Sequence, residues 1–363
     1  MSLELPKASK EMRDWKWGDY EPFFEHLLNQ KITSNNIEVW MKYWSNFSEL
    51  IGEVGTDVYV STTVDTTDKQ AKKRFNTFLE DISENASNKN QKLKKKLLES
   101  GLTPENFDIP LRAIKSEVEL FRKENLPLQT KDSKLSKDYD AIIGSQTVEW
   151  EGEEITITQL SPVLLETDRK RREKAWRLAA ERRLKDREKI NEIWQKILEI
   201  RIQIAENANF DNYRSWRWEY LKRFDYTPKD CLKFHSAIEK VIMPHVNKLI
   251  KKRKELLGLD VLKPWDLSVD PLNREPLTPF ENATELEEKC HRIFGAVDEE
   301  LGNHFNVMRE HKLLDLANRK GKAPGGYCTE YYHQRLPFIF MNAVGTHSDV
   351  QTMLHEGGHA FHV

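Results

Sequence analysis

Cysteine is scarce in this sequence, and the few cysteines lack the spacing of a metal site or of a disulfide framework. Only Cys231, Cys290 and Cys328 occur in 363 residues. Because they are far apart and odd in number, a disulfide-stapled scaffold and a C-x-x-C zinc site are both excluded as organising features. Nothing local to any of them supports a catalytic cysteine. Three free thiols fit a reducing compartment, so we expect a cytoplasmic protein.

The chain also has no long apolar run and no surplus of charge of one sign. Its first twenty residues are charged and rich in tryptophan, without the apolar centre of a signal peptide, and no later stretch approaches a membrane span. The formal net charge is −2 at pH 7, and the basic runs at 92–96 and 251–254 lie in acid-balanced helical surroundings. We therefore expect neither a membrane nor a nucleic acid as a partner.

Glycine and proline are few, with 15 and 14 residues, while 32% of the chain is charged. This composition favours long charged helices. Apolar residues recur at helical spacing through residues 20–126, and residues 168–207 read as one long helix. Between these regions we expect a polar linker at 126–139 and a small hairpin at 147–157. We place a domain boundary here, with a helical N-terminal domain over residues 1–145 and a second domain over residues 146–363.

The most informative segment is His355-Glu356-Gly357-Gly358-His359. On a helix, positions i and i+4 share one face about 6 Å apart, so the imidazoles of His355 and His359 can converge on one metal ion. The H-E-x-x-H pattern is typical of a zinc-binding helix whose glutamate acts as general base toward an attacking water. The pattern therefore predicts His355 and His359 as ligands of one Zn²⁺ per chain and Glu356 as the catalytic base.

The flanking residues predict a helix with two unlike faces. Ser348 as N-cap and Gln351 three residues later make a capping-box pattern. Apolar residues recur on the face opposite the histidines: Val350, Leu354, Gly357 and Phe361. His362 lies about 10 Å along the axis from His355, too far for a straight helix to bring all three rings to one ion. We expect His362 to be a cleft residue or a packed surface histidine.

Two short strands are expected just before this helix. The turn-rich segment 321–328 predicts a loop leading into a first strand, and residues 337–342 read as a second strand. Because the second strand is followed directly by the metal helix, we expect an extended peptide to pair with its edge. Lys322 in the loop is not part of a phosphate-binding G-x-x-x-x-G-K-[ST] motif. It is compatible either with closure of the sheet or with substrate contact.

A third metal ligand is missing from this motif. Catalytic zinc normally has three protein ligands and a water, and the longer motif with a third histidine requires Gly where His362 stands. The remaining solution is a glutamate from a later helix, which would lie beyond Val363. We therefore expect the chain to be the front part of an enzyme and to be inactive on its own because its zinc site is incomplete.

With these motifs, the sequence resembles the thimet-oligopeptidase and oligoendopeptidase F family of zinc metallopeptidases. The most specific similarity lies in the last fifty residues, and it extends more weakly over most of the chain. The matching segments are 321–328, 338–342 and 354–362, and then 172–176, 208–213 and 265–267.

The resemblance implies a mainly helical, two-lobed, zincin-like molecule with a deep cleft and a small β-sheet before the zinc helix, its C-terminal part absent here. Residues 146–363 would be the first portion of the catalytic domain. The implied activity is endopeptidase cleavage of short unstructured peptides, with Zn²⁺ held by His355 and His359 and with Glu356 as base. The family's third ligand and its downstream His and Tyr have no counterpart in this chain.

Two alternatives remain open from the sequence. A zinc carboxypeptidase of related helical fold shares the same kind of helix. A non-catalytic peptide-binding module would also present this surface, although it has no need for Glu356 beside two metal ligands. Peptide preference and oligomeric state are not determined by the sequence.

Overall fold

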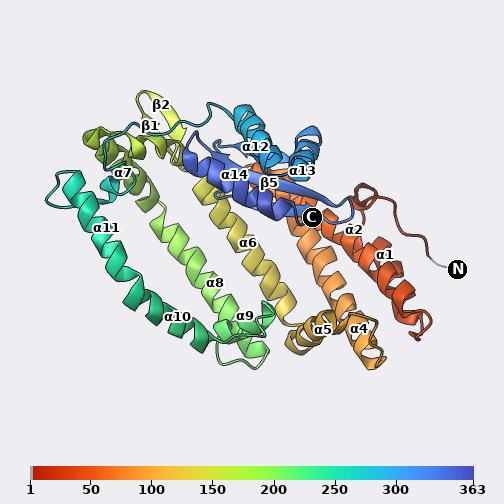
Figure 1. The fold of residues 1–363 in the computed structure, drawn as a ribbon. Coiled ribbons are helices and arrows are strands. Elements are labelled where there is room, and N and C mark those ends of the chain that lie inside the picture. Colours follow the sequence, from red (N-terminus) through yellow and green to blue (C-terminus); the bar gives the residue numbers. More distant parts are fainter. Residues whose placement is uncertain (1–2) are drawn as a thin grey trace.

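The computed structural model describes residues 3–363, and these residues are mainly helical, with two small sheets (Figure 1). The helices in the first part of the chain are α1 (Trp17–Asn29), α2 (Ile37–Val64), α3 (Lys69–Thr77), α4 (Glu84–Glu99), α5 (Asp108–Leu120) and α6 (Asn125–Gly144). Those that follow are α7 (Arg169–Leu184), α8 (Arg187–Asn207), α9 (Tyr213–Tyr220), α10 (Pro228–Val241), α11 (Met243–Leu256), α12 (Ala283–Val297), α13 (Glu299–Glu310) and α14 (His347–Ala360). The mainly helical class predicted from the sequence is confirmed.

The first sheet is the predicted hairpin, in which β1 (Thr147–Trp150) pairs with β2 (Glu153–Thr156). Glu151 and Gly152 form its two-residue turn, both with positive φ, as a tight hairpin turn of this length requires. The second sheet has the order β3-β5-β4, made of β3 (Leu314–Ala317), β4 (Tyr327–Tyr331) and β5 (Leu336–Ala343). It precedes α14 directly, so the small sheet expected before the metal helix is confirmed.

The core around the second sheet fixes the position of α14. Strand β5 is central, parallel to β3 and antiparallel to β4. Its residues pack with α12, α13 and α14, which lie around it in Figure 1. The buried apolar residues of this core are Phe280, Leu286, Cys290, Phe294, Phe305, Met308, Leu316, Ile339, Met341, Ala343, Met353 and Ala360. Helix α14 is thus held against a sheet and two other helices.

Helix α2 links the N-terminal helices to this sheet. Its first half belongs to a separate aromatic core with α1 and α4. Farther along, the Thr56 hydroxyl donates to the Glu330 carbonyl at 3.1 Å. The buried Glu53 carboxylate accepts hydrogen bonds from the backbone N–H groups of His333 and Gln334, each at 3.0 Å. The turn between β4 and β5 is therefore fastened to the N-terminal helices.

Two sequence predictions about helix boundaries are wrong. The expected linker at 126–139 lies inside α6, because Pro127 falls in the first turn, where the backbone N–H has no helical partner to lose. The expected helix over 168–207 is broken between α7 and α8. The Asp186 carboxylate at this break accepts hydrogen bonds from Arg182 and from the Gln146 side chain, which fixes the corner.

Helix α7 is anchored by a buried ion pair. Asp266 is fully buried, and its carboxylate accepts two hydrogen bonds from the Arg169 guanidinium at 2.9 and 2.8 Å. Arg172, also buried, donates to Asp266 and to the carbonyl of Trp265. The hydrogen bonds from Arg169 hold the pKa of Asp266 below its ordinary value, although burial opposes them.

Within residues 3–363, no helix is both long and apolar enough to cross a membrane.

Candidate metal centre

Helix α14 begins two residues earlier than its sequence pattern predicts. Thr346 is the N-cap, and its hydroxyl accepts a hydrogen bond from the Asp349 N–H at 3.3 Å. In return the Asp349 carboxylate accepts from the backbone N–H groups of Thr346 and Val344 at 2.8 and 3.0 Å. The predicted Ser348–Gln351 capping box is wrong. The Asp349 carboxylate accepts hydrogen bonds from two backbone N–H groups, and its negative charge interacts favourably with the positive end of the helix dipole.

The buried face of α14 is centred one residue away from the predicted apolar stripe. Met353 and Ala360 lie in the core, while Val350, Leu354 and Phe361 only border it. Gly357 is confirmed as a packing position. A Cβ atom there would lie 2.5 Å from Cζ of Phe294 on α12, so only glycine lets the two helices come this close.

The two predicted metal ligands lie together on the outer face of the helix. Nε2 of His355 and Nε2 of His359 are 3.2 Å apart, and the two ring planes are nearly perpendicular. Both side chains are exposed. Two imidazole nitrogens bound to one tetrahedral zinc ion at about 2.0–2.1 Å would lie about 3.3 Å apart. The pair therefore has the spacing and the donor chemistry that a zinc ion requires.

Glu356 lies on an adjoining side of the helix and borders a cavity of about 490 Å³. It is only 8% exposed, yet it lines this cavity together with His359 and His362. The opposite wall is formed by residues of β4, including Cys328 and Thr329. The predicted general base is thus neither turned away into the core nor freely solvated. It lies where a molecule bound between α14 and β4 would meet it.

The sequence predicts that an extended peptide pairs with the edge of the strand at 337–342, which is β5, but the strand that borders the cavity is β4. In the order β3-β5-β4, strand β5 has partners on both sides, whereas β4 pairs only with β5 among the residues that the structure describes. The outer edge of β4 therefore offers backbone donors and acceptors beside the cavity. The exposed edge of β4 could not be predicted from the sequence, because the order of strands in a sheet depends on pairing between segments far apart in the chain.

Neither Cys328, which lines the cavity, nor His333, in the turn that follows β4, is free to act as a metal ligand or nucleophile. Burial, together with the negative charges of Glu356 and Glu330, raises the pKa of the Cys328 thiol to about 11, so it stays protonated at neutral pH. His333, in the turn after β4, is engaged elsewhere, since its ring nitrogen lies 3.1 Å from the Lys7 carbonyl oxygen.

A third protein ligand for zinc is not found among residues 3–363. No group of three His, Cys, Asp or Glu side chains in this range is placed to hold a metal ion. The described residues thus fit two of the three protein ligands that a catalytic zinc site normally has.

Lys322 closes the sheet and does not face the cavity. It is 2% exposed, and its ammonium group donates to the carbonyl groups of Asp315 and Ala317, each at 2.9 Å, and to that of Met341. These bonds fasten the 321–326 loop across β3 and β5. Of the two roles left open by the sequence, the structure supports the structural one.

Comparison with known proteins agrees with this geometry. The model of peptidase family M3 matches residues 163–363, which is more than half of the chain. The chain belongs to peptidase family M3. The resemblance to the oligoendopeptidase F group is thereby confirmed at the level of the family.

Curated relatives include the group B oligopeptidase PepB of Streptococcus agalactiae serotype III (strain NEM316), 26% identical over 179 residues. An oligoendopeptidase F homolog of Lactococcus lactis subsp. lactis (strain IL1403) is 25% identical over the same number of residues. Each match covers 48% of this chain and 28% of the relative. The solved structure of PZ peptidase A with an inhibitor superimposes with a TM-score of 0.87 at 26% identity, over 99% of this chain and 64% of that one. The chain therefore spans less than two thirds of the length of these relatives.

Proposed function

We propose that this chain carries the zinc-binding helix and the general base of an endopeptidase that hydrolyses short, unstructured peptides. The observation that carries the proposal is the convergence of the His355 and His359 Nε2 atoms at 3.2 Å, beside Glu356 on the wall of a cavity. A structural role for this face would not require two imidazoles pointed at one position next to a carboxylate.

The free edge of β4 supplies the means of binding a peptide. An extended backbone added to this edge would form strand-like hydrogen bonds, and the cavity beside it would accept alternate side chains. Such recognition needs an extended segment that can reach the strand edge, and a short unstructured peptide can supply one without first unfolding. This geometry supports short peptides as the substrate class.

The chemistry divides between the metal and the protein. Zinc, when bound by His355 and His359, would supply the Lewis acid that polarises the scissile carbonyl. Glu356 would accept a proton from the attacking water and deliver it to the nitrogen of the leaving amine. General base catalysis of this kind is typically worth about 10²–10⁴-fold in rate. Strand β4 would hold the substrate carbonyl in reach by fixing its backbone.

Two properties are proposed for the isolated residues 1–363. They bind zinc weakly, because two histidines without a third protein ligand hold the ion less tightly than a complete site. They also do not cleave peptides. If these residues bind a peptide but do not cleave it, they act as the non-catalytic peptide-binding module that the sequence left open as an alternative.

The first experiment measures zinc affinity by competition with a chromogenic chelator. His355→Ala and His359→Ala should each abolish the weak binding, whereas His362→Ala, a neighbouring histidine, should leave it unchanged. Stoichiometric tight binding by the unmodified chain would show that another residue completes the site and would overturn the proposal of an incomplete centre.

The second experiment uses a form extended to the length of the relatives and a quenched fluorescent peptide. Glu356→Gln should retain zinc and lose turnover, and retained activity would refute its role as base. A peptide with an amidated C-terminus should be cleaved as well as its free acid. Cleavage only of the free acid would favour the carboxypeptidase alternative.

We also propose that the domain boundary lies between residues 145 and 146, with residues 146–363 forming part of the catalytic domain. The proposal is supported by the turn between α6 and β1 at this point and by the start of the family match at residue 163.

A further inference from the structure

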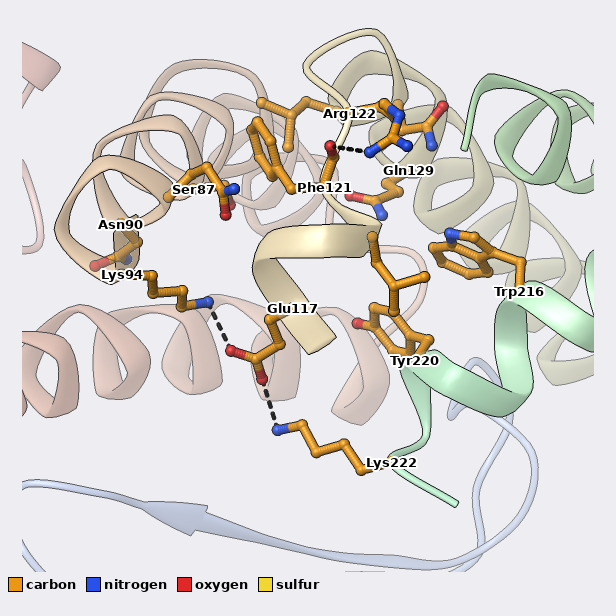
Figure 2. A pocket seen from close by; sticks show the side chains of 14 residues that line it. Ser87, Asn90, Lys94, Glu117, Phe121, Arg122, Gln129, Trp216, Tyr220 and Lys222 are labelled. Atoms are coloured by element: carbon orange, nitrogen blue, oxygen red, sulfur yellow. Dashed lines mark hydrogen bonds and ion pairs between the residues drawn. The ribbon is translucent and has the colours of Figure 1, made fainter. Parts of the chain in front are cut away.

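A second cavity of about 340 Å³ lies between α4, α5, α6 and α9 (Figure 2). Its volume is in the range of small-molecule sites. It shares no lining residue with the cavity beside α14. Nothing in the proposed peptidase chemistry uses it.

One wall of this cavity holds a polar group without a partner. Trp216 is only 4% exposed, and its indole Nε1–H group is buried and makes no hydrogen bond within the part of the chain that the structure describes. In Figure 2 the nitrogen edge of the Trp216 ring faces the interior of the cavity, toward Gln129. A buried donor left unpaired costs about 1–3 kcal/mol. A bound molecule with a hydrogen-bond acceptor would remove this cost.

The charges around the cavity favour an anion. Lys94 and Lys222 both pair with the single carboxylate of Glu117, at 2.9 and 2.6 Å (Figure 2). Burial raises the pKa of Glu117, but the two ammonium groups outweigh it and lower the pKa overall. Arg122 adds a third positive charge, and its guanidinium donates to backbone carbonyl groups, for example that of Phe121 at 2.8 Å. The lining of the cavity thus carries three cationic side chains and one carboxylate.

The rest of the lining is mixed, with the polar side chains of Ser87, Asn90, Gln91, Asn125 and Gln129 beside an apolar part. Leu120, Phe121 and Leu126 contribute to this apolar part. The Trp216 ring stacks on that of Tyr220, with centroids 5.0 Å apart and planes 27° apart. A planar or aliphatic group of modest size would bury its surface against these side chains.

We propose that this cavity binds a small organic carboxylate with an apolar body. The carboxylate would accept the hydrogen bond of the Trp216 indole and offset the excess positive charge of the lysines, and the apolar body would pack on the leucine and aromatic wall. A cation is disfavoured by the same charges. The inference goes beyond the proposed peptidase function and does not depend on it.

The test uses the whole 363-residue chain with ¹⁵N-labelled tryptophan and two probes, 3-phenylpropionate and its uncharged analogue 3-phenyl-1-propanol. The carboxylate should shift the indole resonance of Trp216 in a saturable way and should bind more tightly than the alcohol. Trp216→Phe keeps the ring but removes the donor, and it should weaken binding about tenfold or more. Trp218→Phe is the matched control, since the Trp218 indole donates to the Tyr226 carbonyl and does not line the cavity. It should bind like the unmodified chain.

Lys222→Gln provides an independent check if Trp216→Phe fails to fold. Lys222 is 45% exposed, so its replacement leaves the packing intact, and binding of the carboxylate should weaken while that of the alcohol does not change. Equal binding of the two probes, unchanged affinity in Trp216→Phe, or the absence of any saturable shift would each overturn the proposal.

Discussion

The close approach of α14 to α12 at Gly357 can be tested by adding a single methyl group. In Gly357→Ala the new Cβ atom would lie 2.5 Å from Cζ of Phe294. This ring cannot swing aside easily, because it is 6% exposed and packs edge-on against Phe361 with centroids 4.9 Å apart. Overpacking of this kind costs about 1–3 kcal/mol. Alanine also gains about 0.5–1 kcal/mol over glycine inside a helix.

The adjacent Gly358 is the matched control. It lies in the same helical turn, and a Cβ atom there would meet nothing within 4 Å. In Gly358→Ala the unfolding free energy should therefore rise by the helix-propensity term alone. In Gly357→Ala the same rise should be offset by the cost of the steric clash with Phe294. Because the gain cancels, the two variants should differ in unfolding free energy by about 2 kcal/mol, the middle of the overpacking range.

Urea unfolding of the unmodified chain and the two variants measures this difference. Gly357→Ala should be the less stable variant, and Phe294→Leu in the same chain should recover part of the loss by making room for the methyl group. If Gly357→Ala proves as stable as Gly358→Ala, the contact between the two helices does not limit the position of α14, and the reasoning fails.

Three further predictions concern polar groups that hold parts of the fold in place. Asp349→Ala removes the acceptor at the start of α14 and should lower the unfolding free energy by about 1 kcal/mol, whereas Ser348→Ala should stay within about 0.5 kcal/mol; the reverse order would restore the cap predicted from the sequence. Asp266→Asn should cost about 3–5 kcal/mol at neutral pH, because it leaves the buried guanidinium group of Arg172, and the partly exposed one of Arg169, without their charged partner. Hydrogen bonds from arginine lower the pKa of Asp266, so its contribution to stability is full above the ordinary pKa of 3.8 and is lost as pH falls through the lower folded pKa. The difference in urea midpoint between Asp266→Asn and the unmodified chain should therefore be smaller at pH 3 than at pH 7, and an equal difference at both would contradict this. Glu53→Ala removes the shared acceptor of the turn after β4 and should destabilise the chain by about 1–3 kcal/mol in the same assay, while Glu49→Ala, which breaks an ion pair with a largely exposed arginine, should cost less than about 1 kcal/mol.

The local parts of the candidate site were predictable because they depend on residues close together in sequence. The four-residue spacing of His355 and His359 places both rings on one face of any α-helix, and the structure shows their Nε2 atoms in contact distance. The hairpin at 147–157 was predictable for the same reason, since alternation and a glycine turn are local signals. The helix cap was mistaken because two overlapping patterns competed within the same few residues.

Other features required the fold. Which strand keeps a free edge follows from the pairing of β3 with β5 across more than twenty residues, and this decided that β4 and not β5 faces the cavity. The burial of Lys322 under the sheet and the unpaired indole of Trp216 also depend on segments far apart in the chain. None of these leaves a periodic trace in the sequence.

The sequence by itself therefore determined which groups share one helix, namely two imidazoles and a carboxylate, because helical geometry is fixed by local backbone bonding. Only the tertiary structure decided what surrounds these three groups. It buries most of Glu356, places the edge of β4 opposite it, and brings α14 close to α12 at Gly357. Such neighbours are chosen by packing and strand pairing between distant segments, and this is why they emerge only when the whole chain is folded.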